Sequence, residues 1–261
     1  MTVLASTDFI LDVGYGLRPG YDNVQVAGIN RDIDTANIED IWNIGGVKTW
    51  FTTAVQLDIV STDTGDTSAG AGARSLIIEG LDANFDPLPP EIIALNGTTT
   101  VTTVNSYIRV NLAAVNSSGT YGSTTAGANL GTITVEQTGG GNPQAQLDIG
   151  KGRSENTHFT IPNGKCAQIL QAILTVDDAS PAEIDFIIRE DADIIVAPFS
   201  PKIIVPIGVA TPAGVHVIPL DTGIALAPKT DLWAIAQAGS NNAIVKVAYE
   251  LNIVDETLVN C

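Results

Sequence analysis

The sequence predicts an all-β protein, and three observations lead to that prediction. Thr, Gly, Val, Ile and Ala dominate the 261 residues, whereas the strong helix formers Glu, Lys, Gln and Arg are sparse. Many apolar runs alternate with polar residues at a period of two, which is typical of a strand with one buried face. Turn signals rich in Gly, Pro and Asn separate the runs. These features predict two antiparallel β-sandwich or jelly-roll-like domains preceded by an extended N-terminal arm.

The arm is expected over residues 1–46. Gly and Pro interrupt residues 12–20, and residues 26–43 read as extended chain with a single helical turn near residues 38–42. A segment without the periodicity of its own domain often packs on a neighbouring subunit. A terminal strand and loop tied to the sheet of its own subunit explain the same residues, and both interpretations stay open.

The first sandwich domain is expected over residues 47–150, and its centre is the stretch 70–115. Four candidate strands occur there, and Asn96-Gly97 between two of them is a strong hairpin signal, because type I′ turns need positive φ at both central residues. Residues 107–112 alternate: Ile108, Val110 and Leu112 are expected on the buried face. The intervening Tyr107, Arg109 and Asn111 are expected on the wet face.

The second sandwich domain is expected over residues 151–261, after a boundary at residues 150–154. Strand signals recur there at nearly regular spacing. Ile184, Phe186 and Ile188 share one face of a strand. The last strand has the clearest alternation, and its inward side chains are expected to be Val245, Val247, Tyr249, Leu251 and Ile253.

The charge balance limits the classes of partner. The formal charge is −17, from 12 basic and 29 acidic residues. Residues 1–150 hold 5 basic and 16 acidic residues, and residues 151–261 hold 7 and 13, so both parts are acidic. We therefore expect no nucleic-acid partner and no anionic membrane partner. The sequence shows no apolar span of 18 residues and no signal peptide, which predicts synthesis and folding in a cytoplasm.

Only two cysteines occur, so the sequence does not predict a disulfide scaffold. Cys166 lies in an apolar strand pattern and is expected to be a small buried hydrophobic residue. Cys261 is expected to be exposed. Whether the two are free thiols stays open.

The sequence contains no complete P-loop or nucleophile-elbow motif. The Gly-Lys pairs at 150–151 and 164–165 lack the upstream Gly of a P-loop, and no Gly-x-Ser-x-Gly elbow occurs. His158 and His216 are the only histidines, and neither has a Cys or a second His at metal-ligand spacing. Both are expected on sheet faces, although a Ser-His-Asp triad assembled from distant residues stays open. No catalytic residue, metal site or cofactor site is predicted.

Acidic residues cluster in three short segments, and two of these segments have the alternate spacing that begins a calcium loop. Asn30, Asp32 and Asp34 have the spacing of an EF-hand start, but Thr35 and Ile41 stand where Gly and Glu are needed. The other two clusters consist of Asp82, Asn84 and Asp86, and of Glu190, Asp191 and Asp193. Solvated turns are the favoured interpretation of all three, and binding of a hard cation is the alternative.

Turn and strand residues spread over residues 26–255 carry a resemblance to a family. They are residues 29–34, 41–42, 45–46, 69–74, 78–82, 95–97, 101–103, 108–110, 161–165 and 229–232. In these segments the chain resembles virion structural proteins of tailed bacteriophages, especially marine and cyanobacterial phages. The resemblance implies a β-rich, oligomeric subunit associated with a capsid or virion surface. It carries over no catalytic residue.

The leading hypothesis is therefore a non-enzymatic capsid decoration, or cement, protein located in the virion. Its expected partners are the major capsid protein, bound through the arm, and further copies of itself in a homotrimer. One alternative is a spike or fibre module that binds host or glycan through loops 62–73 or 116–129. A major shell subunit is another, and a polysaccharide-degrading enzyme is the least favoured.

Overall fold

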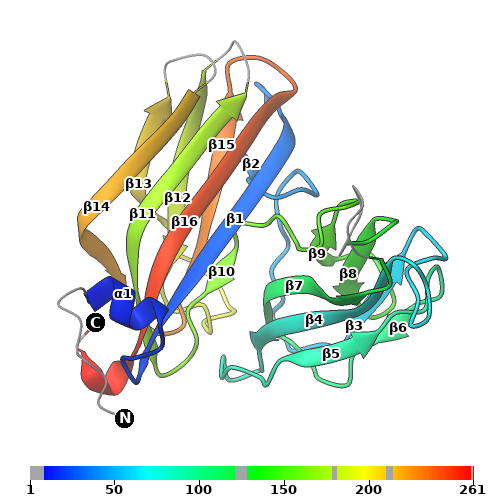
Figure 1. Ribbon diagram of the computed structural model, residues 1–261. Helices are drawn as coiled ribbons and strands as arrows, with labels where there is room; N and C mark the ends of the chain where they lie inside the picture. The colour runs from blue at the N-terminus through cyan, green and yellow to red at the C-terminus, as the bar shows by residue number, and fades with distance from the viewer. Residues whose placement is uncertain (1–8, 121–127, 178–180, 210–213, 260) are drawn as a thin grey trace.

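The computed structural model describes residues 9–120, 128–177, 181–209, 214–259 and 261. These residues form two β-sandwiches that lie side by side (Figure 1). A short helix, α1 (Phe9–Gly14), and a 3₁₀ turn, η1 (Glu256–Leu258), lie outside the sheets. The predicted all-β fold is confirmed.

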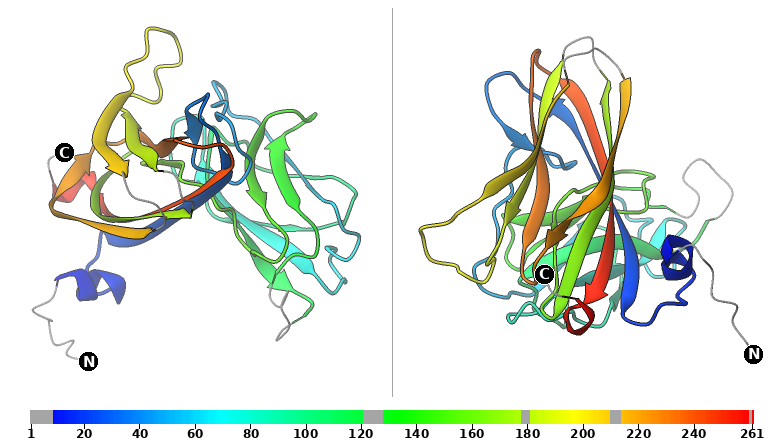
Figure 2. Two further views of the ribbon diagram at one scale, coloured as in Figure 1. Left: turned by 90° about the horizontal axis from the view of Figure 1, so that it is seen from above. Right: turned by 90° about the vertical axis from the view of Figure 1, so that its left-hand side faces the viewer.

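The larger body, called here the C-terminal sandwich, consists of two antiparallel sheets. The first has the order β1 (Tyr21–Ile33), β16 (Ala243–Asp255), β11 (Lys165–Asp177), β14 (Gly214–Leu226). The second has the order β10 (Phe159–Thr160), β15 (Asp231–Ala238), β12 (Ala182–Arg189), β13 (Lys202–Val209). The short strand β2 (Glu39–Asp40) also pairs with β15. Figure 2 shows the two sheets facing each other.

The core of this sandwich follows the predicted alternation. On β16 the predicted inward residues Val245, Val247, Tyr249, Leu251 and Ile253 are all at most 7% exposed. On β12 the predicted inward residues Ile184, Phe186 and Ile188 are at most 5% exposed. Apolar side chains at every second position pack one sheet against the other. The alternation in the sequence was therefore sufficient to predict which side chains of these two strands are buried.

The prediction of an extended arm over residues 1–46 is wrong for most of its length. β1 pairs with β16 over the register Tyr21↔Val254 to Asn30↔Val245, which makes it the edge strand of the first sheet. Residues 38–42 form strand β2 and a bridge at Trp42 instead of a helical turn. The open alternative, a terminal strand tied to a sheet of its own subunit, describes residues 21–40, while residues 1–8 lie outside the described residues.

The smaller body, called here the middle sandwich, also has two antiparallel sheets. One has the order β6 (Val101–Thr102), β3 (Leu57–Ser61), β8 (Ile133–Gln137), β9 (Pro143–Leu147). The other has the order β5 (Glu91–Ala94), β4 (Ala73–Leu81), β7 (Arg109–Ser118). Its core residues run from Phe51 to Leu147, with Ala192 added from the C-terminal half.

The predicted hairpin at Asn96-Gly97 is wrong, although the turn itself is present. Gly97 has φ +62°, but Asn96 does not have a positive φ, so the type I′ geometry is met at only one of its two central residues. However, β5 pairs with β4 in one sheet, and β6 pairs with β3 in the other. The turn therefore carries the chain from one sheet to the other, and the peptide N–H of Gly97 donates to Asp66 O at 2.7 Å instead of closing a hairpin.

The expected boundary at residues 150–154 lies between the two cores. The C-terminal core draws on residues 26–41 and 159–253, and the middle core ends at Leu147. The C-terminal sandwich is thus built from the two ends of the chain, with the middle sandwich inserted between them (Figure 1).

The cysteine interpretation needs a correction. Cys166, at the start of β11, forms a disulfide with Cys261. Cys166 is 2% exposed, as expected, but it is a cross-link and not an unpaired apolar side chain. The bond ties the last residue to a strand 95 positions earlier.

Candidate functional site

The junction between the two sandwiches holds a cluster of buried charges and a cleft. A linker, residues 152–157, runs through this junction as an extended segment. On one side Gly152 O accepts from the N–H of Val115 at 2.7 Å, and on the other the N–H of Asn156 donates to Ala27 O at 2.9 Å. The linker therefore bridges β7 of the middle sandwich and β1 of the C-terminal sandwich.

Five ionisable residues meet beneath this linker, and we call them the buried seam: Asp40, Lys48, Arg109, His158 and Asp231. Each is at most 4% exposed. They come from four regions of the sequence, and the fold brings them together where β2, β7, β10 and β15 converge.

Arg109 and Asp231 form the central pair of the buried seam. Arg109 Nε and Nη2 each donate to Asp231 at 2.9 Å, in a bidentate arrangement that joins the two sandwiches. Nη1 of Arg109 donates to the carbonyl oxygens of Phe51 and Ile108, both at 2.9 Å. The guanidinium also lies between the rings of Trp50 and Phe85, 4.7 Å and 5.1 Å from their centroids.

The remaining seam residues, Asp40 and Lys48, lie close to the imidazole ring of His158. Nε2 of His158 lies 2.8 Å from Asp40 Oδ2, and Nδ1 contacts the Asn156 side chain. The same Asp40 oxygen accepts from the backbone N–H of Lys48 at 2.8 Å. The Lys48 ammonium donates to Gln144 O and lies 5.1 Å from the Trp50 centroid.

Burial shifts two pKa values in the seam. Desolvation, with repulsion from Arg109, lowers the pKa of Lys48 from 10.5 to about 7, against the attraction of Asp231 and Asp40. Desolvation and the nearby Lys48 lower the pKa of His158 from 6.5 to about 4, against its hydrogen bond to Asp40. At neutral pH the imidazole of His158 is therefore neutral.

The geometry of the buried seam is that of a cluster that supports the fold, and not that of a catalytic site. Perturbed pKa values in a cleft would suggest catalysis, but none of the five seam residues lines the cleft described below. His158 has Asp40 on one ring nitrogen and Asn156 on the other, so no serine completes a triad there.

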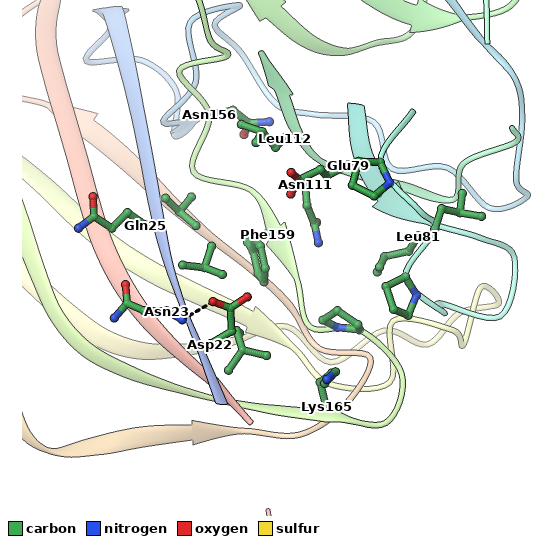
Figure 3. Close-up of a pocket in the computed structure, with 18 of the residues that line it drawn as sticks. Asp22, Asn23, Gln25, Glu79, Leu81, Asn111, Leu112, Asn156, Phe159 and Lys165 are labelled. Atoms are coloured by element: carbon green, nitrogen blue, oxygen red, sulfur yellow. Dashed lines mark hydrogen bonds between the residues drawn. The ribbon is translucent and has the colours of Figure 1, made fainter. Parts of the chain in front are cut away.

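A cleft of about 850 Å³ opens beside the linker, between β1 and the β4–β7 face of the middle sandwich. Figure 3 shows Asp22, Asn23 and Gln25 of β1 on one wall, Glu79, Asn111 and Leu112 on the other, and Phe159 between them. Its size is in the range of ligand-binding pockets, about 300–1,000 Å³.

Most polar groups of this cleft are already engaged. Asn111 forms a reciprocal amide pair with the Thr160 backbone, with both N···O distances at 3.0 Å. Lys165 forms an ion pair with Asp255, and Arg153 Nη2 donates to Gln25 O at 3.4 Å. Glu79 is exposed and, among the described residues, has no side-chain partner.

Two residues of the predicted wet face of residues 107–112 are buried. Tyr107 is 0% and Arg109 is 2% exposed. Ile108 and Val110 are buried as predicted, but Tyr107 joins the same core and Leu112 is half-buried in the cleft wall, so the predicted alternation holds only in part. Arg109 is buried because it pairs with Asp231 of the C-terminal sandwich. Sequence reasoning therefore missed Arg109, and it missed Lys48, Trp50 and Asp231 as well. The one available signal was an Arg flanked by apolar residues in a clear strand.

The remaining sequence candidates behave as structural residues. His216 lies on β14, on a sheet face as expected, whereas His158 lies in the buried seam. Asn30 donates to Glu39 and to Asp40 O, and Asp82 Oδ1 accepts from the N–H groups of Asn84 and Asp86, as in a turn. Glu190 and Asp193 pair with Lys202 and Lys229.

Within the described ranges, no group of three or more His, Cys, Asp or Glu side chains is placed to hold a metal ion. In the same ranges, no helix is both long and apolar enough to cross a bilayer.

The glycan-binding alternative placed its pocket on two loops. In the first, Asp66 is 0% exposed, and its carboxylate accepts from the N–H groups of Ala73, Leu130 and Gly131. That loop is thus organised around its own carboxylate. In the second loop, residues 121–127 lie outside the described residues.

Comparisons with known proteins give distant likenesses only. No family model and no curated protein matches the chain. The chain is similar to one in a structure of infectious bursal disease virus Gx strain, with 7% identity over 89% of this chain and 72% of that chain, and a TM-score of 0.22. A chain in the crystal structure of an infectious bursal disease virus VP2 subviral particle gives 7% identity over 90% and 71%, with a TM-score of 0.23. TM-scores this low do not establish a shared fold or function.

Proposed function

We propose that this chain is a non-enzymatic structural subunit of a tailed-bacteriophage virion, and specifically a capsid decoration protein. Its partners are the major capsid protein and further copies of itself in a homotrimer. It is made in the host cytoplasm and located in the virion. The resemblance of its turn and strand motifs to virion structural proteins supports the class of protein.

The observation that carries this proposal is an exposed apolar strip on the outer face of the first sheet. Val215 and Val217 of β14 are 67% and 58% exposed, and Ile173 of β11 is 38% exposed. Strand register places Ile173 between Val217 and Ala248. We call these four residues the outer strip.

An apolar strip of this kind fits a subunit contact. A shallow hollow of about 240 Å³, lined partly by Ile173 and Ala248, lies on the same face. Adjacent exposed apolar side chains mark interaction surfaces in soluble proteins. A net charge of −17 opposes non-specific association, so the occupant we assign to the strip is another copy of this chain in a specific trimer.

Attachment through an N-terminal arm over residues 2–46 is not part of the proposal, because β1 and β2 belong to the C-terminal sandwich. The non-enzymatic assignment rests on the buried seam, whose five ionisable groups have hydrogen-bond partners inside the fold and are kept from solvent. We expect no hydrolysis of host-surface glycans by the purified protein.

Light scattering of the purified protein tests the self-association. We expect a mass of three chains of 27.2 kDa each, and we expect the monomer mass for Val217→Asp, which places a charge in the outer strip. Val47→Asp is the matched control, since Val47 is 70% exposed outside the strip. A monomeric wild-type protein, or a trimer that survives Val217→Asp, would contradict the proposed contact.

Co-sedimentation tests the attachment. Purified protein is mixed with shells assembled from the major capsid protein of the virus that encodes it. A decoration protein binds preformed shells, whereas binding to host cells and not to shells would favour the spike or fibre alternative. Assembly of this chain into shells unaided would identify a major shell subunit.

A further inference from the structure

One edge of β1 carries backbone groups that pair with no other strand. The Asn156 N–H donates to Ala27 O, so the peptide groups of Ala27 point away from β16. Peptide groups of alternate residues point the same way, which gives Gln25, Asn23 and Tyr21 the same direction. Two contacts agree with this: Gln25 O accepts from Arg153, and the Asn23 N–H is capped by its neighbour Asp22.

The unpaired edge faces the cleft. Tyr21 to Val26 all line it, opposite Asn111 and Leu112 of β7 (Figure 3). Six residues at about 3.4 Å each give an edge on the order of 20 Å long. Neither the Gln25 N–H nor the Asn23 carbonyl has a hydrogen-bond partner among the residues that the structure describes.

The linker shows that an extended chain fits between these two walls. Residues 152–157 bond to Ala113 and Val115 of β7 on one side and to Ala27 of β1 on the other. The cleft continues the same gap along β1, beyond the linker, with Ser154 and Asn156 at the boundary between them. A second extended segment would therefore continue an arrangement that the chain already uses.

The cleft also supplies contacts for side chains. Phe159, Leu81 and Leu88 offer apolar surface. Lys165 pairs with Asp255, so three exposed charges remain in the lining: the carboxylates of Asp22 and Glu79 and the guanidinium of Arg153, which donates to Gln25 O. Their sum is one negative charge, and Glu79 lies on the wall opposite β1. The charge complementary to Glu79 is a Lys or Arg side chain.

We propose that this cleft is a peptide-binding site in which an extended segment of another polypeptide, with apolar residues and a Lys or Arg, adds a strand to the open edge of β1. Strand addition to a sheet edge is a general mode of recognition, with affinity from backbone hydrogen bonds and selectivity from side-chain contacts. The inference does not depend on the proposed virion function.

Peptide selection tests the site. A library of random eight-residue peptides is panned against the immobilised full chain, and the best peptide is synthesised with a fluorescent label and titrated by anisotropy. We expect selected peptides to combine apolar residues with Lys or Arg. Failure to enrich any peptide would overturn the proposal.

Variants at Gln25 separate strand addition from other binding. Gln25→Pro removes the backbone donor, and proline is tolerated on an edge strand whose N–H faces away from the sheet. We expect about tenfold weaker binding. Gln25→Ala keeps the N–H and is expected to bind like wild type. Equal affinities of the proline and alanine variants would overturn the proposal.

Glu79→Lys provides a second test that does not alter the backbone. Binding of the Lys- or Arg-containing peptide should weaken, and the difference from wild type should shrink as salt is added. The thermal unfolding temperature of each variant reports whether the fold is retained. Unchanged binding by Glu79→Lys would contradict the assigned charge contact.

Discussion

Arg109 shows how a single side chain can join two domains. Its guanidinium makes four hydrogen bonds within the junction, two to Asp231 and two to backbone carbonyls, and it contacts two aromatic rings. A buried cation without such partners would be expelled or would destabilise the fold. Thr160 Oγ1 adds a hydrogen bond of 2.6 Å to Asp231, so the carboxylate is equally well satisfied.

The first prediction concerns this pair. Arg109→Met leaves the Asp231 carboxylate buried without its cation, and we expect the free energy of unfolding in urea to fall by about 3–5 kcal/mol. Lys202→Met is the control, because the Lys202–Glu190 pair is exposed, 56% and 46%, and should change stability by about 1 kcal/mol or less. Similar losses in the two variants would show that the seam does not hold the sandwiches together.

The second prediction concerns pH. The His158 pKa is about 4 in the folded chain and 6.5 in the unfolded chain. Between these values the unfolded chain binds the extra proton, so this contribution to stability is present above pH 6.5 and is lost as the pH falls toward 4. A difference of this size corresponds to about 3 kcal/mol.

Urea unfolding at pH 7 and pH 4.5 measures that loss. His158→Gln carries no titrating group at this position, so it should lose less stability than wild type between the two pH values. The carboxylates titrate in both proteins and cancel in the comparison. An equal loss in the two proteins would refute the role of His158.

At the scale of elements, the linker packs closely against β1 at Gly28. A Cβ on Gly28 would lie 2.5 Å from Ile41 O and 2.6 Å from the Thr157 backbone nitrogen. Both are backbone atoms within the hydrogen-bonded junction, so neither can move cheaply. The glycine in β1 is thus required by the close approach of residues 41 and 157.

The third prediction follows from this approach. Gly28→Ala should lower the free energy of unfolding by about 1–3 kcal/mol through overpacking. Gly14→Ala, at the end of α1, is the matched control, since nothing lies within 4 Å of its added Cβ. The two midpoints of thermal unfolding should differ clearly, and coincident midpoints would contradict the packing argument.

The Asn96-Gly97 turn illustrates a limit of local signals at this scale. The dipeptide predicted positive φ at Gly97, and the backbone adopts it. Whether the flanking strands then pair with each other depends on which partners bury them best. β5 pairs with β4 in one sheet, and β6 pairs with β3 in the other sheet. The turn between β5 and β6 therefore connects the two sheets.

At the scale of the whole molecule, the two chain ends close the C-terminal sandwich. β1 pairs with β16, and the Cys166–Cys261 disulfide joins the last residue to β11. A cross-link between positions 95 residues apart removes much freedom from the unfolded chain. The disulfide therefore stabilises the body to which the middle sandwich is attached.

The fourth prediction tests this cross-link. Cys261→Ser should lower the free energy of unfolding by about 2–4 kcal/mol. Position 261 is exposed, so the change leaves no cavity. A reductant should shift wild type to the stability of the variant and should leave the variant unchanged. Equal stability of the oxidised wild type and the variant would show that the bond contributes nothing.

Strand content, the all-β class and the inward faces of β12 and β16 were predictable from the sequence. These features depend on the alternation of neighbouring residues, which is a local property with a period of two. The candidate site was not predictable: none of the five seam residues was identified as a site. Arg109 and Asp231 are 122 positions apart, and no local pattern links them.

The sequence by itself determined that this chain forms antiparallel strands with one apolar face, because side-chain alternation decides which face leaves water. Tertiary structure alone decided that β1 belongs to the C-terminal sandwich, that the polar face around Arg109 is buried, and that a cleft opens beside the linker. These outcomes depend on which distant surfaces bury each other at the lowest free energy, and that choice is made between whole sheets and not between neighbouring residues.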